Sequence, residues 1–518
     1  MDAAGSALIV ALSTLGDTAQ AAGVVVAALL AGIVLVARAA RQRAFAMLGA
    51  LVLTPVLLVA NIWSTDQFVS VRDRPVLLAA AAAGGLVALA FAAVAFHRRP
   101  ELLVLAAAAA LPFRVPIASG GDTSNLLLPL YLVIAAGGVA YAVPRLRSHG
   151  WREDPEPERR PGRLEWLLAA AVVLYALQSA YSSDFDRALA QTIFFYVPFA
   201  LLFALLVRID WTQRLALQCL GILLALAVVF VGIGFVEYAR RELLLNPKVI
   251  SSNQFETYFR VNSLFFDPNI YGRFLATVMI GIAAVLLWSR RTIVAAGCAA
   301  ALALLMSGLV LTLSQSSFTA LLAGLAVLGA LRWGSRRTGI VVGAFAILAV
   351  GIVLVAPGAV GLNQSLDNAS SGRSDLIRGG VELFASRPLQ GWGSGAFRHE
   401  YRTNKKASSE RATAASHTIA ITVAAEQGIV GLGLYLALLA VALAQLLRGA
   451  RRSPVRAAIA AAFVALVVHT LMYAAFLEDP LAWALLAVGT ALAAQQAAAT
   501  TAAQRAAERA RAAGAGAS

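Results

Sequence analysis

The sequence contains few charged residues and almost no cysteine. Only 13% of its 518 residues are Asp, Glu, Lys or Arg, about half the share found in a typical soluble domain. So little charge excludes an ordinary soluble globular protein and indicates a chain whose solvent is lipid. The two cysteines, Cys219 and Cys298, both fall inside apolar segments. They are predicted to pack as small hydrophobic residues, and they provide no disulfide or thiolate metal framework.

Ionisable residues are especially scarce at the centres of the apolar segments. Proton-coupled pumps and ion exchangers generally need such groups along a path through the membrane. Their scarcity argues against transport and favours chemistry at the outer interface. The first ten residues, MDAAGSALIV, also lack the positively charged start of a signal peptide, so no cleaved signal is predicted there.

Apolar residues make up 60% of the chain, and the mean hydropathy is +0.77. Apolar windows of about 20 residues, the length that crosses a hydrocarbon layer of about 30 Å, recur along almost the whole sequence. Because backbone polar groups in lipid must be satisfied within each segment, these windows are predicted to be helices. The predicted fold is an all-α polytopic integral membrane protein with about 14–15 transmembrane helices. The predicted spans begin near Gln20, Ala44, Pro75, Glu101, Ser124, Leu164, Ala188, Gln213, Pro268, Thr292, Ser316, Gly339, Gly428, Arg456 and Leu481.

Arginine is distributed unevenly between the loops on the two sides of this predicted bundle. One side holds most of the basic residues, and by the positive-inside rule it is cytoplasmic, as is the carboxyl terminus. The net charge of +15 therefore has a topological explanation and does not indicate nucleic-acid binding. The predicted divisions are amino-terminal spans 1–236 with a cytoplasmic linker at 144–163, an outer loop 237–267, central spans 268–356, a large outer catalytic loop 357–416, carboxy-terminal spans 417–499 and a cytoplasmic tail 500–518.

The large outer loop is the most polar part of the chain, and it contains several arginines. Guanidinium groups match phosphate oxygens as a bidentate fork, so these arginines suit a lipid-linked phosphate or pyrophosphate. Attraction to anionic headgroups and simple solvation of the loop are alternative explanations. The segment SGRSDLIRGGVELF predicts a short amphipathic helix with Arg373 at its start and Arg378 within it. That helix should end before Arg387-Pro388, because proline disfavours helix at the preceding residue.

A glycine-rich turn, Gly391-Trp392-Gly393-Ser394-Gly395, follows this helix and allows close approach of the backbone to a ligand. His417 then opens the next apolar helix, where a neutral imidazole could accept a proton from a sugar hydroxyl. A capping or interface histidine is the alternative. Glu426, close to Gly428, is one of few carboxylates placed below the interface. For it a structural role, holding an arginine or a helix-break amide, is predicted.

Three further groups lie at predicted outer turns. Asn269 follows Asp267-Pro268 and places Arg273 one turn inside a span, where it could meet a pyrophosphate. The hydroxyls of Ser314 to Ser317 could cap the following helix. Asp184-Phe185-Asp186 is a DxD pattern that could hold a divalent ion in a metal-dependent transferase, although acidic pairs are common in turns. No other cluster has metal-ligand spacing, so no metal and no cofactor are predicted.

The combined motif resembles the signature of the O-antigen ligase and Wzy-type polymerase superfamily. It runs R-S-D-L-I-x-x-G-V-E-L-F-x-x-R-P-L-x-G-W-G-S-G-A-F from Arg373 to Phe397, and continues with His417-Thr418 and with E-Q-G-I-V-G from Glu426. The resemblance covers roughly residues 267–433 and implies a helical bundle related to the GT-C glycosyltransferases. It makes His417 the base or acceptor-orienting group and Arg373 a pyrophosphate or glycan contact.

The sequence departs from the family at two positions. Ser316-Ser317 stands where the family often has Ser-Arg, so Arg273 or Arg378 is a candidate substitute, and Thr418 replaces the common Asn or Ser. Arg273, Arg378, Arg387, Asn269 and Glu426 are the predicted substrate-binding residues, beside the catalytic pair His417 and Arg373.

The resemblance implies a glycosyltransferase of the cell envelope that acts in polysaccharide biosynthesis. It would transfer a glycan from a polyprenyl-pyrophosphate carrier, such as undecaprenyl pyrophosphate, to a glycan or lipid-glycan acceptor at the outer face of the cytoplasmic membrane. The predicted reaction is inverting and independent of metal, and its partners include membrane lipid but no nucleic acid. Ligase and polymerase are not separated. A metal-dependent GT-C transferase using a polyprenyl-phosphate sugar and a lipid-linked glycan flippase or transporter remain open.

Overall fold

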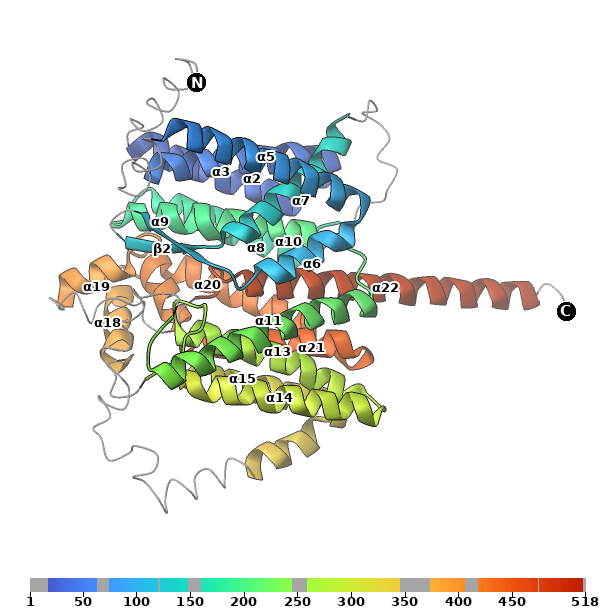
Figure 1. The fold of residues 1–518 in the computed structure, drawn as a ribbon. Coiled ribbons are helices and arrows are strands. Elements are labelled where there is room, and N and C mark those ends of the chain that lie inside the picture. Colours follow the sequence, from blue (N-terminus) through green and yellow to red (C-terminus); the bar gives the residue numbers. More distant parts are fainter. Residues whose placement is uncertain are drawn as a thin grey trace.

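A computed structural model of the chain describes residues 17–62, 74–119, 122–147, 160–244, 259–344, 373–405, 418–473 and 475–515. Its helices run roughly parallel or antiparallel in one bundle (Figure 1). The described part contains ten helices that are long and apolar enough to cross a membrane, together with three shorter apolar helices. The predicted all-helical polytopic membrane fold is therefore confirmed.

The first half of the chain forms one side of the bundle, coloured blue to light green in Figure 1, except for its last helix, which lies among the helices of the second half. Its elements are α2 (Asp17–Val36), α3 (Ala40–Ile62), α5 (Pro75–Arg98), α6 (Pro100–Ala110), β1 (Val115–Ser119), β2 (Asp122–Leu126), α7 (Leu128–Arg147), α8 (Arg163–Ser179), α9 (Phe185–Gln191), the π-helical turn η1 (Thr192–Tyr196), α10 (Val197–Leu206) and α11 (Gln213–Arg240). Segments α9, η1 and α10 continue one another as a single span, and α10 is buried along its whole length.

The second half forms the other side and the centre. Its elements are α13 (Pro268–Trp288), α14 (Thr292–Thr312), α15 (Gln315–Trp333), α18 (Arg373–Ser386), α19 (Phe397–Lys405), α20 (Ile419–Leu447), the 3-10 turn η4 (Ala450–Arg452), α21 (Pro454–Thr470) and α22 (Pro480–Ala515). Residues 335–344 are also helical. Helices α18 and α19 lie at one end of the bundle, while α22 projects from the opposite end (Figure 1).

Several helices begin where the sequence offers a proline or a capping oxygen. Pro75, Pro100, Pro268 and Pro454 stand in the first turns of their helices, where the missing N–H would have no partner in any case. The Ser314 side chain accepts a hydrogen bond from the Ser317 N–H at the start of α15. This confirms the predicted cap by a serine of this turn.

Some predicted spans differ from the observed helices. The segment near Glu101 forms only the 11-residue helix α6, about 16 Å long at 1.5 Å per residue. It stops before Leu111-Pro112, where proline disfavours helix at the preceding residue, and an antiparallel hairpin follows with Val115 opposite Leu126. The span predicted near Gly428 begins earlier, at Ile419, and Gly428 is instead a kink inside α20, with φ 64° and ψ −162°. The helix predicted to end before Arg387 does so, at Ser386.

The glycine-rich turn between α18 and α19 packs backbone to backbone against the α20 kink. Trp392 N–H donates to the Ala425 carbonyl at 3.1 Å, Gly393 N–H to the Glu426 carbonyl at 2.9 Å, and Ile429 N–H to the Pro388 carbonyl at 2.8 Å. A Cβ on Gly391 would lie 2.3 Å from the Glu426 oxygen, and one on Gly428 would lie 2.2 Å from the Leu389 oxygen. Both glycines have positive φ, so only glycine permits this approach.

Replacing Gly428 by alanine is expected to destabilise the protein by at least about 2 kcal/mol, because a positive φ is strained for alanine and its Cβ would collide with the Leu389 carbonyl. Thermal unfolding of the detergent-solubilised protein measures this loss. Gly433→Ala in the same helix is the control, since a Cβ there meets nothing within 4 Å. Equal unfolding temperatures for the two variants would contradict the packing argument.

Candidate functional site

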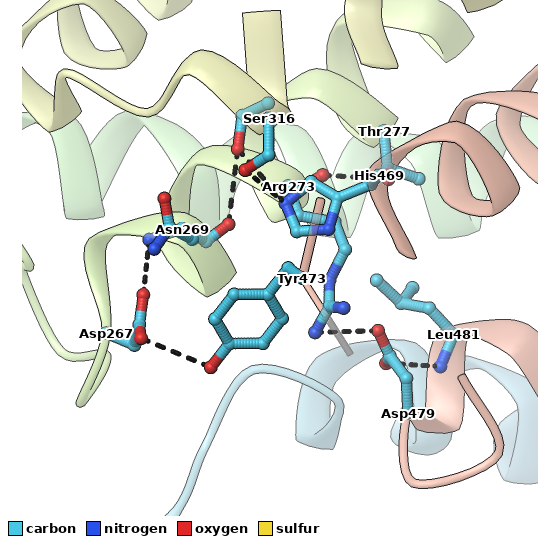
Figure 2. A network of polar contacts seen from close by, with 10 residues as sticks. Asp267, Asn269, Arg273, Thr277, Ser316, His469, Tyr473, Asp479 and Leu481 are labelled. Carbon is cyan, nitrogen blue, oxygen red and sulfur yellow. Dashed lines mark hydrogen bonds and ion pairs between the residues drawn. The ribbon is translucent and has the colours of Figure 1, made fainter. Parts of the chain in front are cut away.

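A buried polar network surrounds Arg273 in the first turns of α13 (Figure 2). The Arg273 side chain is only 3% exposed and forms an ion pair with Asp479, its Nη2 lying 2.8 Å from Oδ2. The other Asp479 oxygen accepts a hydrogen bond from the Leu481 N–H at the start of α22. An ion pair this deep needs both partners, because either charge alone would be desolvated without compensation.

Asp267 connects this network to the aromatic residue Tyr473. The Tyr473 hydroxyl donates to Oδ2 of Asp267 at 3.1 Å, and the Asn269 N–H donates to Oδ1 at 2.6 Å. The Tyr473 ring also faces the Arg273 guanidinium, with 5.9 Å between the guanidinium carbon and the ring centroid. Burial and the negative charge of Asp267 raise the pKa of Tyr473 well above its ordinary value, so this tyrosine stays neutral and donates.

Serine hydroxyls and His469 form the opposite wall of the network. Oγ of Ser314 donates to Oδ1 of Asn269 at 2.8 Å, and Oγ of Ser316 lies 3.2 Å from Nε2 of His469. Oγ of Ser317 donates to the Asn269 carbonyl at 3.2 Å. The hydroxyls of the α15 start thus bond the α13 start and α21, which holds three spans together at this end of the bundle.

Arg273 retains hydrogen-bonding capacity that the protein does not use. Within the described residues, its Nε and Nη1 have no hydrogen-bond partner. Arg260 and Arg114 bring two further positive charges: Arg260 Nη2 donates to Oδ1 of Asn269 at 3.1 Å, and Arg114 interacts electrostatically with Arg273 and Asp479. In this described cluster, Arg114, Arg260 and Arg273 lie near the carboxylates of Asp267 and Asp479, and Arg114 also interacts with Glu478. The two unused donors of Arg273 favour an anionic ligand, since guanidinium donors suit phosphate oxygens.

A second polar site, a cavity of about 70 Å³, lies between α8, α9, α20 and the loop before α22. This volume is space for about five water molecules. Its polar lining includes Arg187, Gln191, Arg398, Thr422, Glu426, Gln427 and Glu478, together with three tyrosines. Nε2 of Gln191 donates to Glu478, and Oε1 of Glu426 accepts from the Phe397 N–H at 3.1 Å. Two consecutive carboxylates therefore belong to two adjacent polar sites: Glu478 lines this cavity, and Asp479 pairs with Arg273.

The start of α20 is tied to the same loop. The Thr418 hydroxyl donates to the Leu471 carbonyl at 3.0 Å, two residues before Tyr473. Through this bond the beginning of α20 lies beside the segment that carries Tyr473, Glu478 and Asp479. The glycine-rich turn joins it from the other side through its bonds to Ala425 and Glu426.

A comparison with protein families identifies the part of the chain that contains this turn. Residues 299–436 match the family model described as O-antigen ligase. The chain carries an O-antigen ligase domain. The predicted resemblance to the O-antigen ligase and Wzy-type superfamily is confirmed. No curated protein and no solved structure matches the chain.

The O-antigen ligase domain places the chain among multi-pass membrane proteins of glycan transfer. The match supports a glycosyltransferase-like enzyme with a lipid-linked glycan and an acceptor as its partners. The matched segment includes α18, the glycine-rich turn and the first half of α20. Arg273 and Asp479 both lie outside it, so the buried ion pair joins the parts of the chain that precede and follow the matched segment.

The predicted site residues occupy different environments around the O-antigen ligase domain. Arg273 and Asn269 belong to one buried network, and Glu426 anchors the turn before α19 through the Phe397 amide. This contact fits its predicted structural role with a backbone amide. Arg378 is exposed on α18, and the Arg387 guanidinium stacks on Trp392, 3.8 Å from the ring centroid.

The two predicted catalytic residues stand at the edges of described segments. Arg373 is the first residue of α18, as expected from the sequence. His417 lies outside the described residues and directly precedes Thr418, the residue before α20. Their catalytic roles stay predictions.

The DxD pattern has a structural use at its first carboxylate. Oδ1 of Asp184 accepts the Arg187 N–H at 3.3 Å and so caps α9, while Asp186 is exposed. Among the residues that the structure describes, no group of three or more His, Cys, Asp or Glu side chains is arranged to hold a metal ion.

Sequence reasoning missed Asp479, Glu478, Tyr473 and His469. The signal for the first two was an acidic pair directly before Pro480 in an otherwise apolar region. An acidic pair at such a position implies a buried cationic partner, but only packing shows which arginine it meets. His469 was passed over because it lies in an apolar span, where its serine partners, more than 150 residues away, are not visible from sequence.

Substituting Arg273 by alanine is expected to destabilise the protein by about 3–5 kcal/mol, because Asp479 would remain buried without its partner. The double variant Arg273→Ala/Asp479→Asn should recover part of this loss by removing the orphaned charge. Thermal unfolding in detergent measures both, with the exposed Arg98→Ala as control. Equal instability of the single and double variants would show that charge compensation is not the cause.

Glu478 predicts a pH dependence of stability. Burial raises its pKa above the ordinary 4.5, an effect that the charges of Arg187 and Arg114 partly offset. The folded state therefore holds the Glu478 proton more tightly than the unfolded state. The stability that this proton contributes to folding is complete below pH 4.5, and it is lost as the pH rises through the pKa of Glu478 in the folded state. Glu478→Gln, which cannot ionise, should gain stability relative to the unmodified protein as pH increases from 4.5 to 8. A difference in unfolding temperature that stays constant with pH would contradict this assignment.

Proposed function

We propose that the protein transfers a glycan from a polyprenyl-pyrophosphate carrier to an acceptor hydroxyl at the outer face of the cytoplasmic membrane. The observation that carries the proposal is the buried Arg273 network, with its unused guanidinium donors, beside the start of α20 in an O-antigen ligase domain. Such a network suits the phosphates of a lipid-linked donor whose isoprenoid tail remains in the bilayer.

In the proposed reaction, the acceptor oxygen attacks the anomeric carbon while the bond from that carbon to the pyrophosphate oxygen breaks. Attack opposite to the leaving group inverts the anomeric centre. His417 takes the proton of the acceptor hydroxyl as general base. The pyrophosphate leaves with the bonding electron pair, and Arg373 and Arg273 stabilise its developing charge.

Guanidinium groups fill the role that a metal ion has in other transferases, so no metal is required in this proposal. Pyrophosphate is already a good leaving group, and for that reason no general acid is assigned. The glycine-rich turn ties the end of α18 to α20, because its backbone is bonded to the residues beside Gly428. Ligase and polymerase would differ only in the acceptor that reaches this site.

A transfer assay tests the proposal. The purified protein is incubated with a lipid-linked oligosaccharide and candidate acceptors, with and without EDTA. Activity should survive EDTA, fall about 10²–10⁴-fold in His417→Ala, which removes a general base, and fall about 10²–10³-fold in Arg373→Ala, which removes a charge-stabilising donor. The exposed residues His97 and Arg98 at the end of α5 provide matched alanine controls with unchanged activity.

Other outcomes would support the alternatives. Full activity in His417→Ala would refute the proposed base. Loss of activity on chelation and in Asp184→Ala would favour a metal-dependent transferase that uses the DxD pair. Movement of the lipid-linked glycan across the membrane without a new glycosidic bond would favour a flippase.

A further inference from the structure

Four arginines line one pocket at the end of the bundle opposite to α18 and α19. The pocket has a volume of about 750 Å³ and lies between the start of α8, the end of α20, η4, the start of α21 and the middle of α22. Its arginines are Arg163, Arg448, Arg452 and Arg456, and its lining includes no carboxylate. Arg448, Arg452 and Arg456 are close together in sequence around the α20–α21 turn, and the tertiary fold brings Arg163 of α8 beside them.

Arg456 forms the buried floor of this pocket and is 6% exposed. Its Nη2 donates to the Arg448 carbonyl at 2.6 Å, and its Nη1 donates to Gln496. Gly449 has φ 75°, and a Cβ there would lie 2.9 Å from Nη1 of Arg456. The turn before η4 is therefore shaped around the guanidinium. Within the described residues, none of the four arginines forms an ion pair with a carboxylate. Arg163, Arg448 and Arg452 are exposed, whereas the charge of Arg456 is buried and therefore favours an anionic ligand.

An apolar groove adjoins the arginine pocket. It is lined by Pro161, Gly162, Arg163, Trp166, Leu167 and Val441, and it shares Arg163 and Val441 with the pocket. Trp166 is 55% exposed on α8, and tryptophan is enriched where a membrane protein meets the headgroup layer. The arginine pocket thus continues into a surface suited to a hydrocarbon chain.

We propose that this combined site binds one anionic phospholipid. Its phosphate lies among Arg448, Arg452 and Arg456, and an acyl chain follows the groove past Trp166 and Leu167. The adjoining groove favours a lipid over free phosphate, because inorganic phosphate would use only the pocket. General attraction of basic residues to an anionic leaflet does not require a shaped site. It would act equally on arginines outside the pocket, such as Arg336 and Arg337 after α15, which do not line the pocket or the groove.

Binding is tested with the full-length protein in a neutral detergent. Phosphatidylglycerol and phosphatidylcholine with the same acyl chains are titrated against it, and the apparent Kd is obtained from the shift in unfolding temperature. Phosphatidylglycerol should stabilise the protein and phosphatidylcholine should not. Arg448→Gln/Arg452→Gln should weaken the apparent affinity about thirtyfold, since each arginine near an anionic surface contributes roughly fivefold.

Arg336→Gln/Arg337→Gln is the matched control, because it removes the same charge from exposed residues outside the pocket and should retain the affinity. Trp166→Ala should weaken lipid binding while all four arginines remain. An equal loss of phosphatidylglycerol affinity in both double variants would refute the proposed site and would indicate diffuse attraction of basic residues to the lipid. Equal stabilisation by inorganic phosphate would overturn the lipid assignment.

The linker before α8 carries four carboxylates, Glu153, Asp154, Glu156 and Glu158, and they are a competing source of negative charge. In a variant with Glu153→Gln, Asp154→Asn, Glu156→Gln and Glu158→Gln, the phosphatidylglycerol effect should keep its size. A lipid effect found only in that variant would show that the linker fills the pocket and would refute the proposal.

Discussion

The cost of placing a charge inside an apolar bundle governs the arrangement at the α18 end of this protein. Arg273 is inside a span, so it needs compensation, and Asp479 provides it from the other end of the chain. This pair fixes the loop before α22 against α13, and the same loop then supplies Tyr473 to Asp267 and Glu478 to the neighbouring cavity. A single desolvated ion pair thus sets the positions of several other polar groups. Because two N–H groups of Arg273 have no hydrogen-bond partner in the described residues, the network is a candidate for binding an anionic ligand and not only for stabilising the fold.

The glycine-rich turn and the kink in α20 form one structural unit, although they are separated in sequence. Gly391 and Gly428 each permit the backbone of the other segment to approach more closely than a side chain would allow. The two segments therefore depend on each other in this chain, because each supplies the glycine that the other requires. The unit also carries Glu426, whose carboxylate accepts the Phe397 amide and so orients the start of α19. The motif is therefore in large part a device that positions α18 and α20.

Arginine has different surroundings at the two ends of the bundle. Near α13 the guanidiniums are interleaved with carboxylates, a tyrosine and serines, and they form one mixed polar network. At the α20–α21 turn four arginines meet without a carboxylate in their pocket, beside an apolar groove. The first arrangement suits a substrate that must bind and then leave with altered charge. The second suits a ligand that remains, such as a lipid of the surrounding membrane.

The sequence by itself determined the fold class, most of the spans and the helix that ends before Arg387, because hydropathy, proline and capping residues act over short distances along the chain. It also indicated Arg273, Asn269 and Glu426 as polar residues with unusual positions. It failed at α6, where a proline shortened an apolar segment, and at Gly428, which kinks α20 instead of beginning it. Only the tertiary structure decided that Arg273 meets Asp479, that Ser316 meets His469 and that Arg163 joins Arg456 in one pocket. These partners lie on helices far apart in sequence, and their pairing depends on how whole spans pack, which no local pattern encodes.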